Sequence, residues 1–391
     1  SLLGPPGGSF KSIEYVRDGM LLTGGFNGRL YLSIDYGRNW TDITPHKITR
    51  GMVVEQISYH APTDDVYLIV RDMKRGLLIR SSRVDFLDGL NKPDIMFPET
   101  PIRALALSEG VPPRIFVGTD ERLHYSLNGG RSWKSAPSQM KNPQVESLVI
   151  DPDSADIVYA GSWQRPYKTT NFGKTWQPIH NGMAPDSDVF VMLFDNDKRL
   201  WAGTCGHAYR SSNKGSKWVK KRVGLKGKRI HCLALPKGGR AGDLFAGTDN
   251  GLHLFRHAAD AWMQIIPGVV VQDVTIDDKG NAFIATEGRG VLKHTISPPR
   301  TQSVNNGLFA SSPRAITASV YDNVAAGEGI VNPMRLKPVP YDINQPAVKA
   351  EPGDSNSGNQ ASNQSHVKRR QDFWTGLMYQ GSNSGLWRND G

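Results

Sequence analysis

A short turn sequence recurs four times in register, and this repetition limits what the chain can fold into. The shared pattern is S/T-x-D/N-x-G-x-x-W. Its copies contain Ser33, Asp35, Gly37 and Trp40; Ser126, Asn128, Gly130 and Trp133; Thr169, Asn171, Gly173 and Trp176; and Ser211, Asn213, Gly215 and Trp218. A chain that repeats one turn at similar spacing repeats the structural unit that carries it.

Each part of the turn has its own physical role. The Asp or Asn side chain predicts hydrogen bonds to backbone amides two residues further on, which would close the turn. The glycine supplies a positive φ at little cost. The tryptophan begins the outgoing strand, and we expect its ring to pack against a neighbouring sheet.

The residues between the turns predict four short antiparallel strands per unit. The unit from 145 to 179 reads VESLVI, IVYAGS, PYKTT and TWQPI. Such a small sheet cannot bury both faces alone and needs copies of itself on either side. Glycines 118, 161, 203 and 247 end the second strands and lie 43, 42 and 44 residues apart. This period is typical of β-propeller blades.

Counting the units predicts an all-β fold with about seven blades over residues 1–296. The seventh unit shows only three strands, so its missing strand should come from the segment before Ser9 or from 373–391. The C-terminal LMYQGSNSGLWR favours the second source, because it resembles DLFAGTDNGLHLFR of the sixth unit. Residues 297–372 are rich in Pro, Asn, Ser and Gln without periodicity, which predicts an extended or disordered arm.

The repeated turn resembles the Asp-box of bacterial sialidases, sortilin and related β-propellers, over residues 10–296. In those families the Asp-boxes are structural. The resemblance also implies glycosidase chemistry, but its catalytic sets are missing. Sialidases place an arginine in an R-I-P motif before the first Asp-box, where this chain reads FKSIEYVRDGM. Xyloglucan-degrading relatives use two propellers and an Asp pair between them. We therefore predict no catalytic residues.

Other residues that could carry chemistry have simpler explanations. Four acids that follow first strands suit turn formation: Asp151, Asp153, Asp195 and Asp277. Five histidines show no zinc-ligand spacing, so neither a metal nor a cofactor is predicted: His207, His231, His253, His257 and His294. The chain's two cysteines, Cys205 and Cys232, are interpreted as core thiols.

The charge distribution is uneven, and the net charge is +10. No acidic residue occurs from 198 to 242, where thirteen Lys and Arg lie. The densest part predicts a basic patch of Lys217, Lys220, Lys221, Arg222, Lys226, Lys228 and Arg229. This patch is suited to an acidic protein surface or to nucleic acid. The alternative is a solvated blade edge whose lysines deter edge pairing.

Localisation signals are sparse. No apolar run approaches the roughly 20 residues that cross a membrane. The N-terminal SLLGPPGGSF lacks the basic head and apolar core of a secretory signal. These features favour a virion or cytoplasmic protein without a membrane span.

Three functional hypotheses follow. The first is a non-catalytic propeller held by protein partners, copies of itself included, in a larger assembly; by analogy of architecture we predict a phage tail or virion component. The second is a propeller that binds or hydrolyses cell-surface glycans, with Trp163, Tyr167 and Trp201 stacking on sugar rings. The third, ranked lower, is an assembly factor similar to the seven-bladed photosystem II stability proteins, which are exported and lack this tail.

Overall fold

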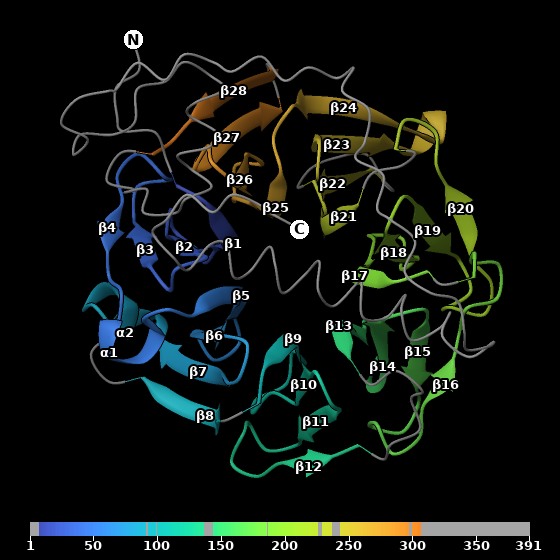
Figure 1. Cartoon of the computed structure of the whole chain (residues 1–391), viewed down its shortest axis with the longest axis horizontal. Helices are drawn as coiled ribbons and strands as arrows, with labels where there is room; N and C mark the ends of the chain where they lie inside the picture. Colours follow the sequence, from blue (N-terminus) through green and yellow to red (C-terminus); the bar gives the residue numbers. More distant parts are fainter. Residues whose placement is uncertain are drawn as a thin grey trace, which may run out of the picture. The chain divides into compact units, whose positions relative to one another are not determined.

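The computed structural model describes residues 8–305 apart from 91–92, 99, 137–143, 186, 226–228, 237–242 and 297–298. These residues form seven antiparallel sheets of four strands each (Figure 1). The sheets surround a common axis, so the described part of the chain is an all-β, seven-bladed propeller. The prediction of the fold class is confirmed.

The strands follow the chain blade by blade. Blades one to three contain β1 (Phe10–Tyr15), β2 (Leu21–Gly25), β3 (Leu30–Ser33), β4 (Thr41–Asp42); β5 (Val53–His60), β6 (Asp65–Arg71), β7 (Gly76–Ser82), β8 (Asp94–Pro98); and β9 (Ile102–Leu107), β10 (Ile115–Thr119), β11 (Leu123–Ser126), β12 (Lys134–Ser135). Blades four and five contain β13 (Val145–Asp151), β14 (Ser154–Ser162), β15 (Pro166–Thr169), β16 (Gln177–Pro178); and β17 (Val189–Phe194), β18 (Leu200–Thr204), β19 (Ala208–Ser211), β20 (Val219–Lys221). Blades six and seven contain β21 (Ile230–Ala234), β22 (Leu244–Thr248), β23 (Gly251–Arg256), β24 (Ala261–Pro267); and β25 (Val271–Ile276), β26 (Ala282–Thr286), β27 (Val291–Ile296), β28 (Pro299–Ser303).

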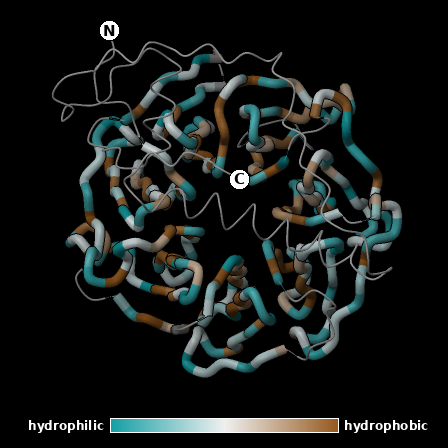
Figure 2. Tube along the Cα trace, viewed as in Figure 1, coloured by the Kyte–Doolittle hydropathy of each residue, from teal (hydrophilic) through white to brown (hydrophobic). Residues whose placement is uncertain are grey.

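The first strand of every blade lies nearest the axis and the fourth lies outermost (Figure 1). The ring closes because β1 packs against β5 on one side and against β25 on the other. Several second strands are buried along their whole length, as expected where both faces of a sheet pack against neighbouring blades, and hydrophobic segments occur in every blade (Figure 2). The closing core combines Phe10, Tyr31 and Trp40 of blade one with Phe283 and Val304 of blade seven or its end.

The seventh blade is complete, which corrects the prediction that it lacks a strand. Its fourth strand, β28, follows β27 directly and pairs with it from Ile296↔Pro299 to Leu292↔Ser303. The prolines of SPPR suggest a linker in the sequence, but proline is tolerated at the first position of an edge strand. No strand from 373–391 is required for closure. Those residues, and residues 1–7, lie outside the described part of the chain.

The four repeated turns share one hydrogen-bonding geometry. In the first, the Ser33 hydroxyl accepts from the Gly37 amide at 2.9 Å, and the Asp35 carboxylate accepts from the Asn39 amide at 2.9 Å. The side chain at the Asp or Asn position therefore bonds four residues on, not two as predicted. The predicted positive φ is present at the glycine, for example 77° at Gly37 and 86° at Gly215.

The turn tryptophans join neighbouring blades, as predicted. The Trp40 indole N–H donates to the Val304 carbonyl at 2.7 Å, and that of Trp133 donates to the Met96 carbonyl at 3.1 Å. Trp218 likewise donates to the Ile179 carbonyl of the preceding blade. Trp176 differs, because its indole N–H bonds to Gly173 within its own turn.

Three blades lack the repeated turn, and two of them have a short helix in its place. In blade two, α2 (Arg83–Leu87) fills the position, and Ser82 and Asp85 form a capping box at its start. In blade six, the 3-10 helix η1 (His257–Ala259) leads into Asp260, which takes the left-handed conformation that glycine has elsewhere. A short helix α1 (His46–Thr49) links blades one and two. No described helix is long and apolar enough to span a membrane.

Candidate functional site

Every inner strand carries an irregularity near its start, one residue after the first residue in six strands and two residues after it in β5. The pairing of each first strand with its second strand skips one residue there. Such a bulge re-aims the side chain of the extra residue. The seven residues at these positions, which we call the bulge ring, are Lys11, Glu55, Arg103, Glu146, Phe190, His231 and Gln272.

Side chains of the bulge ring contact one another around the axis. The Lys11 ammonium donates to the Gln272 amide oxygen at 3.1 Å and lies 3.4 Å from the Glu55 carboxylate. An Arg103 guanidinium nitrogen lies 3.5 Å from the Glu146 carboxylate. These contacts join blade seven to one, one to two, and three to four. The seven repeated bulges therefore build a single polar rim at one end of the inner strands.

A second set of side chains supports the rim from the ends of the second strands. In five blades the residue at that end contacts the bulge residue of the same blade. Arg71 lies 2.7 Å from Glu55, the Trp163 indole N–H donates to Glu146 at 2.7 Å, and Gln272 donates to Glu287 at 2.6 Å. The other two pairs are Arg103 with Asp120 and His231 with Asp249. One structural rule thus places ten rim side chains.

Glu55 is the most strongly stabilised anion of the rim. Burial alone would raise its pKa, but Arg71, Lys11 and Arg103 together lower the pKa of Glu55 to about 2. Its side chain is 14% exposed, and that of Arg71 is 9% exposed. Glu55 is therefore ionised throughout the physiological range. A permanently charged carboxylate suits recognition of a cationic or hydrogen-bond-donating group, but not proton donation.

The rim has an aromatic sector in blades four and five. Trp163 lies at the end of β14, and Phe190 occupies the bulge of β17. The guanidinium of Arg229 lies over the Phe190 ring, 3.9 Å from its centroid, which is cation–π geometry. Arg229 also forms an isolated antiparallel bridge with Cys205. Flat aromatic surface beside charged side chains can bind peptides or sugars.

Two carboxyl groups lie further along the inner strands: Glu14 is three residues after Lys11 on β1, and Asp273 follows Gln272 on β25. Burial, together with the nearby Asp273, raises the pKa of Glu14 to about 8, although the Tyr59 amide donates to it at 3.3 Å. Burial also raises the pKa of Asp273 to about 6, although it accepts from the Ile13 amide at 3.0 Å. Glu14 therefore holds a proton at neutral pH, whereas Glu55 does not.

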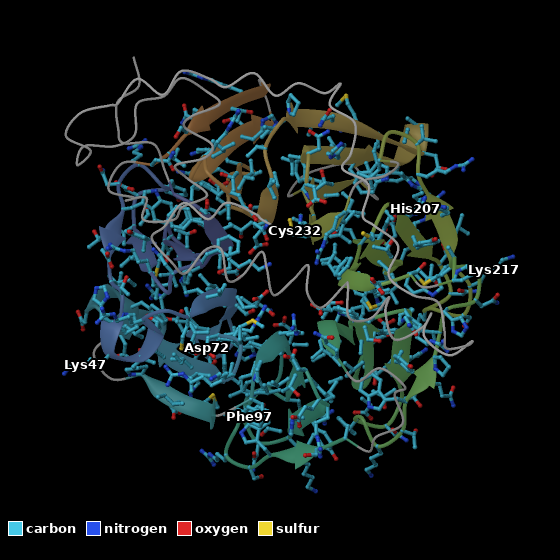
Figure 3. All side chains as sticks on the ribbon, in the orientation of Figure 1. Lys47, Asp72, Phe97, His207, Lys217 and Cys232 are labelled. Atoms are coloured by element: carbon cyan, nitrogen blue, oxygen red, sulfur yellow. The ribbon has the colours of Figure 1, made fainter. Side chains whose placement is uncertain are left out.

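The predicted basic patch does not form one surface. Lys217, Lys220 and Arg222 are exposed along β20 at the outer edge, where Figure 3 shows Lys217. Lys221 turns inward and its ammonium bonds to the Asp260 carboxylate at 2.6 Å. Arg229 belongs to the rim. Lys226 and Lys228 lie outside the described residues.

The other predicted residues lie at the rim, in the core or at the opposite end of the blades. The repeated turns connect third to fourth strands, which places them at the end of each blade opposite the rim. Of the aromatics predicted to contact sugar, Tyr167 and Trp201 are core residues, 2% and 0% exposed, and only Trp163 lies at the rim. Asp151, Asp195 and Asp277 accept backbone amides in turns, as predicted.

The two cysteines differ in burial. Cys232 is buried near the axis, as expected for a core thiol (Figure 3), whereas Cys205 is exposed, contrary to the prediction. Burial lowers the pKa of His231 although Asp249 opposes this effect. Within the described residues no group of three His, Cys, Asp or Glu could hold a metal ion.

Comparison with solved structures supports the fold. The chain matches the extracellular domain of the one-component system BT4673 from B. thetaiotaomicron with a TM-score of 0.59 and 17% identity, covering 74% of this chain and 38% of that one. It matches the GH74 enzyme of Niastella koreensis with a TM-score of 0.61 and 15% identity, covering 78% and 55%. It matches YCF48 bound to D1 peptide with a TM-score of 0.57 and 14% identity, covering 75% and 94%.

These neighbours establish what the chain resembles in three dimensions. It is a seven-bladed propeller of their type. At such identities the likeness concerns the fold alone. The chain spans well under two thirds of the BT4673 domain and of the GH74 enzyme. No protein-family model and no curated protein matches the sequence.

Sequence reasoning missed the rim. A bulge changes which side chain faces the axis without changing the apolar pattern that marks a strand. One signal was nevertheless present: the residue after the small-residue step of the second strand is polar or aromatic in several blades, as in Asp120, Trp163, Asp249 and Glu287. These residues are the partners of the bulge ring.

Proposed function

We propose that this chain is a non-catalytic recognition module and that the axial rim is its binding surface. The observation that carries the proposal is the repeated pairing of bulge residues with second-strand residues in five blades. These pairs hold anionic, cationic and aromatic side chains in fixed positions. A rigid surface of alternating charge suits selective binding of a polar partner.

The spacing of the two distinctive glutamates argues against hydrolysis. Glycosidases need a proton donor and a carboxylate about 5–9.5 Å apart. Glu14 and Glu55 have pKa values that would suit these roles. However, Glu14 bonds to the amide of Tyr59, four residues along β5 from Glu55. At roughly 3.3 Å per residue this separates the two sites by about 13 Å along the strand.

The partner that we propose is a protein within a larger assembly, and the finer assignment is a phage tail or virion component. YCF48 bound to D1 peptide supports the general idea, since that propeller of the same type holds a peptide. The virion assignment rests on architecture alone. The exposed Lys220 of β20 and Lys217 just before it offer an additional contact for an acidic partner.

Native mass spectrometry of the purified chain and of its source particle tests this proposal. We expect the chain in a defined complex, and we expect Arg103→Gln to reduce its occupancy at least tenfold. Arg222→Gln, on the outer edge, is the matched control and should assemble normally. A wild-type chain that stays monomeric and is absent from any particle would contradict the proposal.

A glycan ligand is the second candidate, favoured by the sector of Trp163, Phe190 and Arg229. Binding of the folded chain to a glycan array, compared with Trp163→Ala, tests it. Release of reducing ends from polysaccharide, compared with Glu14→Gln and Glu55→Gln, tests for hydrolysis. If the wild-type protein shows neither glycan binding nor release of reducing ends, this candidate is ruled out.

A further inference from the structure

A cluster of basic side chains lies where blades five and six meet, at the end of the blades opposite the rim. Arg199 follows the first turn of blade five, Arg210 belongs to β19, and His257 begins η1 of blade six. An Arg199 Nη lies 3.5 Å from His257 Nε2, and an Arg210 Nη lies 3.2 Å from His257 Nδ1. One imidazole therefore sits between two guanidinium groups.

This arrangement leaves hydrogen-bond donors facing one another. A guanidinium has only donors, whereas a neutral imidazole has one donor and one acceptor. At most one of the two contacts can therefore be a good hydrogen bond. In the other, N–H faces N–H, and protonation of His257 would make both contacts repulsive.

The nearby acids pair with Arg199 or with cations outside the cluster, and none of them pairs with Arg210 within the described residues. Asp195 is buried and accepts from Arg199 Nε and from the Trp201 indole, both at 2.8 Å. Asp197 pairs with Arg199, and Asp260 pairs with Lys221. Asp243 accepts from Arg256 at 2.8 Å and from the His257 amide at 3.1 Å.

Arg210 is consequently the least compensated charge of the group. Within the described part of the chain, no carboxylate forms an ion pair with it, and its guanidinium lies 5.6 Å from the centroid of the Trp201 ring. Burial and then the charge of Arg199 lower the pKa of Arg210, although Asp260 and Asp195 oppose this effect. Arg210 therefore holds a positive charge in a partly buried place without an ion-pair partner among the described residues.

We infer that Arg199, Arg210 and His257 form a binding site for a phosphate or sulfate group. An oxyanion supplies acceptors to donors that converge from three elements, and it relieves the repulsion between the two guanidinium groups. The site is independent of the rim, because the two lie at opposite ends of the blades. It also gives a specific role to part of the acid-free stretch that the sequence singles out.

Thermal unfolding of the full chain with inorganic phosphate or with sodium sulfate tests the inference. Sodium chloride at matched ionic strength controls for screening, because a ligand that binds only the folded state raises Tm in a saturable way. We expect phosphate or sulfate to raise Tm well above the chloride control. Arg210→Gln should weaken the apparent affinity about tenfold or more, since it removes charge-assisted hydrogen bonds.

Two further variants keep the test decisive. Arg222→Gln removes one positive charge from the exposed outer strand of the same blade and should leave the anion response unchanged. His257→Ala provides an independent loss of response if Arg210→Gln does not fold. An equal response to chloride, or undiminished phosphate and sulfate responses in both folded site variants, would overturn the inference.

Discussion

Glu14 and Glu55 show how position on an inner strand decides the charge of a glutamate. They belong to adjacent blades, and Lys11, on the same strand as Glu14, lies 3.4 Å from the Glu55 carboxylate. Three cations surround Glu55 and hold its pKa at about 2. Glu14 has Asp273 beside it instead, and burial raises the pKa of Glu14 to about 8. Each difference from the ordinary value links protonation to the free energy of unfolding.

Because the pKa of Glu14 is raised in the folded chain, we expect the free energy of unfolding to fall as pH rises. The unfolded chain releases this proton near pH 4.5, whereas the folded chain retains it until about pH 8. The free energy of unfolding should therefore fall between these values and level off above them. Glu14→Gln should be more stable than wild type at pH 8 by roughly 4 kcal/mol and equal to it at pH 4, since one pKa unit corresponds to about 1.4 kcal/mol.

Urea unfolding at several pH values checks this expectation. Glutamine can still accept from the Tyr59 amide, so the substitution removes the titration and keeps the hydrogen bond. Glu109→Gln at an exposed site is the control and should follow wild type. A stability difference that does not change with pH would refute the explanation.

For Glu55 we expect the opposite dependence of the free energy of unfolding on pH. Its folded pKa of about 2 lies below the ordinary 4.5, so its contribution is complete above pH 4.5 and is lost as pH falls toward 2. At pH 7, Glu55→Gln should cost about 3 kcal/mol, because Arg71 stays buried without its carboxylate. Asp94→Asn breaks the exposed pair with Arg80 and should cost under about 1 kcal/mol. Guanidinium unfolding of both variants provides the comparison, and similar costs would argue against a special role for Glu55.

At the scale of the element, the blades depend on two kinds of close approach. The repeated turns hold a tryptophan against the preceding blade, and the glycines that end second strands admit the next blade. A Cβ at Gly161 would lie 2.7 Å from the Val189 side chain and 2.7 Å from its carbonyl oxygen. Gly118 and Gly203 meet Val145 and Ile230 in the same way. The spacing of about 43 residues thus reflects one repeated blade-to-blade contact.

Gly161→Ala should therefore separate two adjacent blades. We expect a loss of about 2–3 kcal/mol, measured by thermal or urea unfolding, because the new methyl meets backbone that cannot move easily. Gly268→Ala is the control: its φ of 70° is unfavourable for alanine, but nothing lies near the new Cβ. It should cost only about 1 kcal/mol. If the control costs as much as Gly161→Ala, crowding between blades is not the reason for the glycine.

At the scale of the whole molecule, stability depends on closing the ring between blades one and seven. The closing seam contains the Trp40 bond to Val304 and the inner-strand bonds of Ile13 to Asp273 and of Tyr15 to Thr275. Closure here does not exchange a strand between the chain ends, because each blade is built from consecutive strands. Side-chain and core contacts therefore hold the seam, together with a backbone hydrogen bond from the Gly290 amide to the Gly8 carbonyl at 2.8 Å.

Trp40→Phe should weaken that seam selectively. It removes the indole N–H and leaves the Val304 carbonyl without this donor, at a cost of about 1–2 kcal/mol. Hydrogen exchange should show faster opening of β28 and β1 than of the other strands. Trp176→Phe is a matched control, since its indole N–H donates to the Gly173 carbonyl of its own turn. Uniform acceleration across all blades in the Trp40 variant would count against a local seam.

Local sequence signals were enough to predict the architecture of this protein, because turn residues and small-residue steps act through local backbone geometry and recur at a fixed period. They predicted seven blades, the positive φ of Gly37 and the packing of Trp40 between blades. The prediction that the seventh blade lacks a strand was wrong, because the prolines at the start of β28 suggested a linker. The prediction that Cys205 is a core thiol was also wrong, because Cys205 is exposed. The rim and the Arg199–Arg210–His257 cluster could be found only in the tertiary structure. Those groups come from different blades, and their charges and pKa values follow from neighbours that are far apart in the chain.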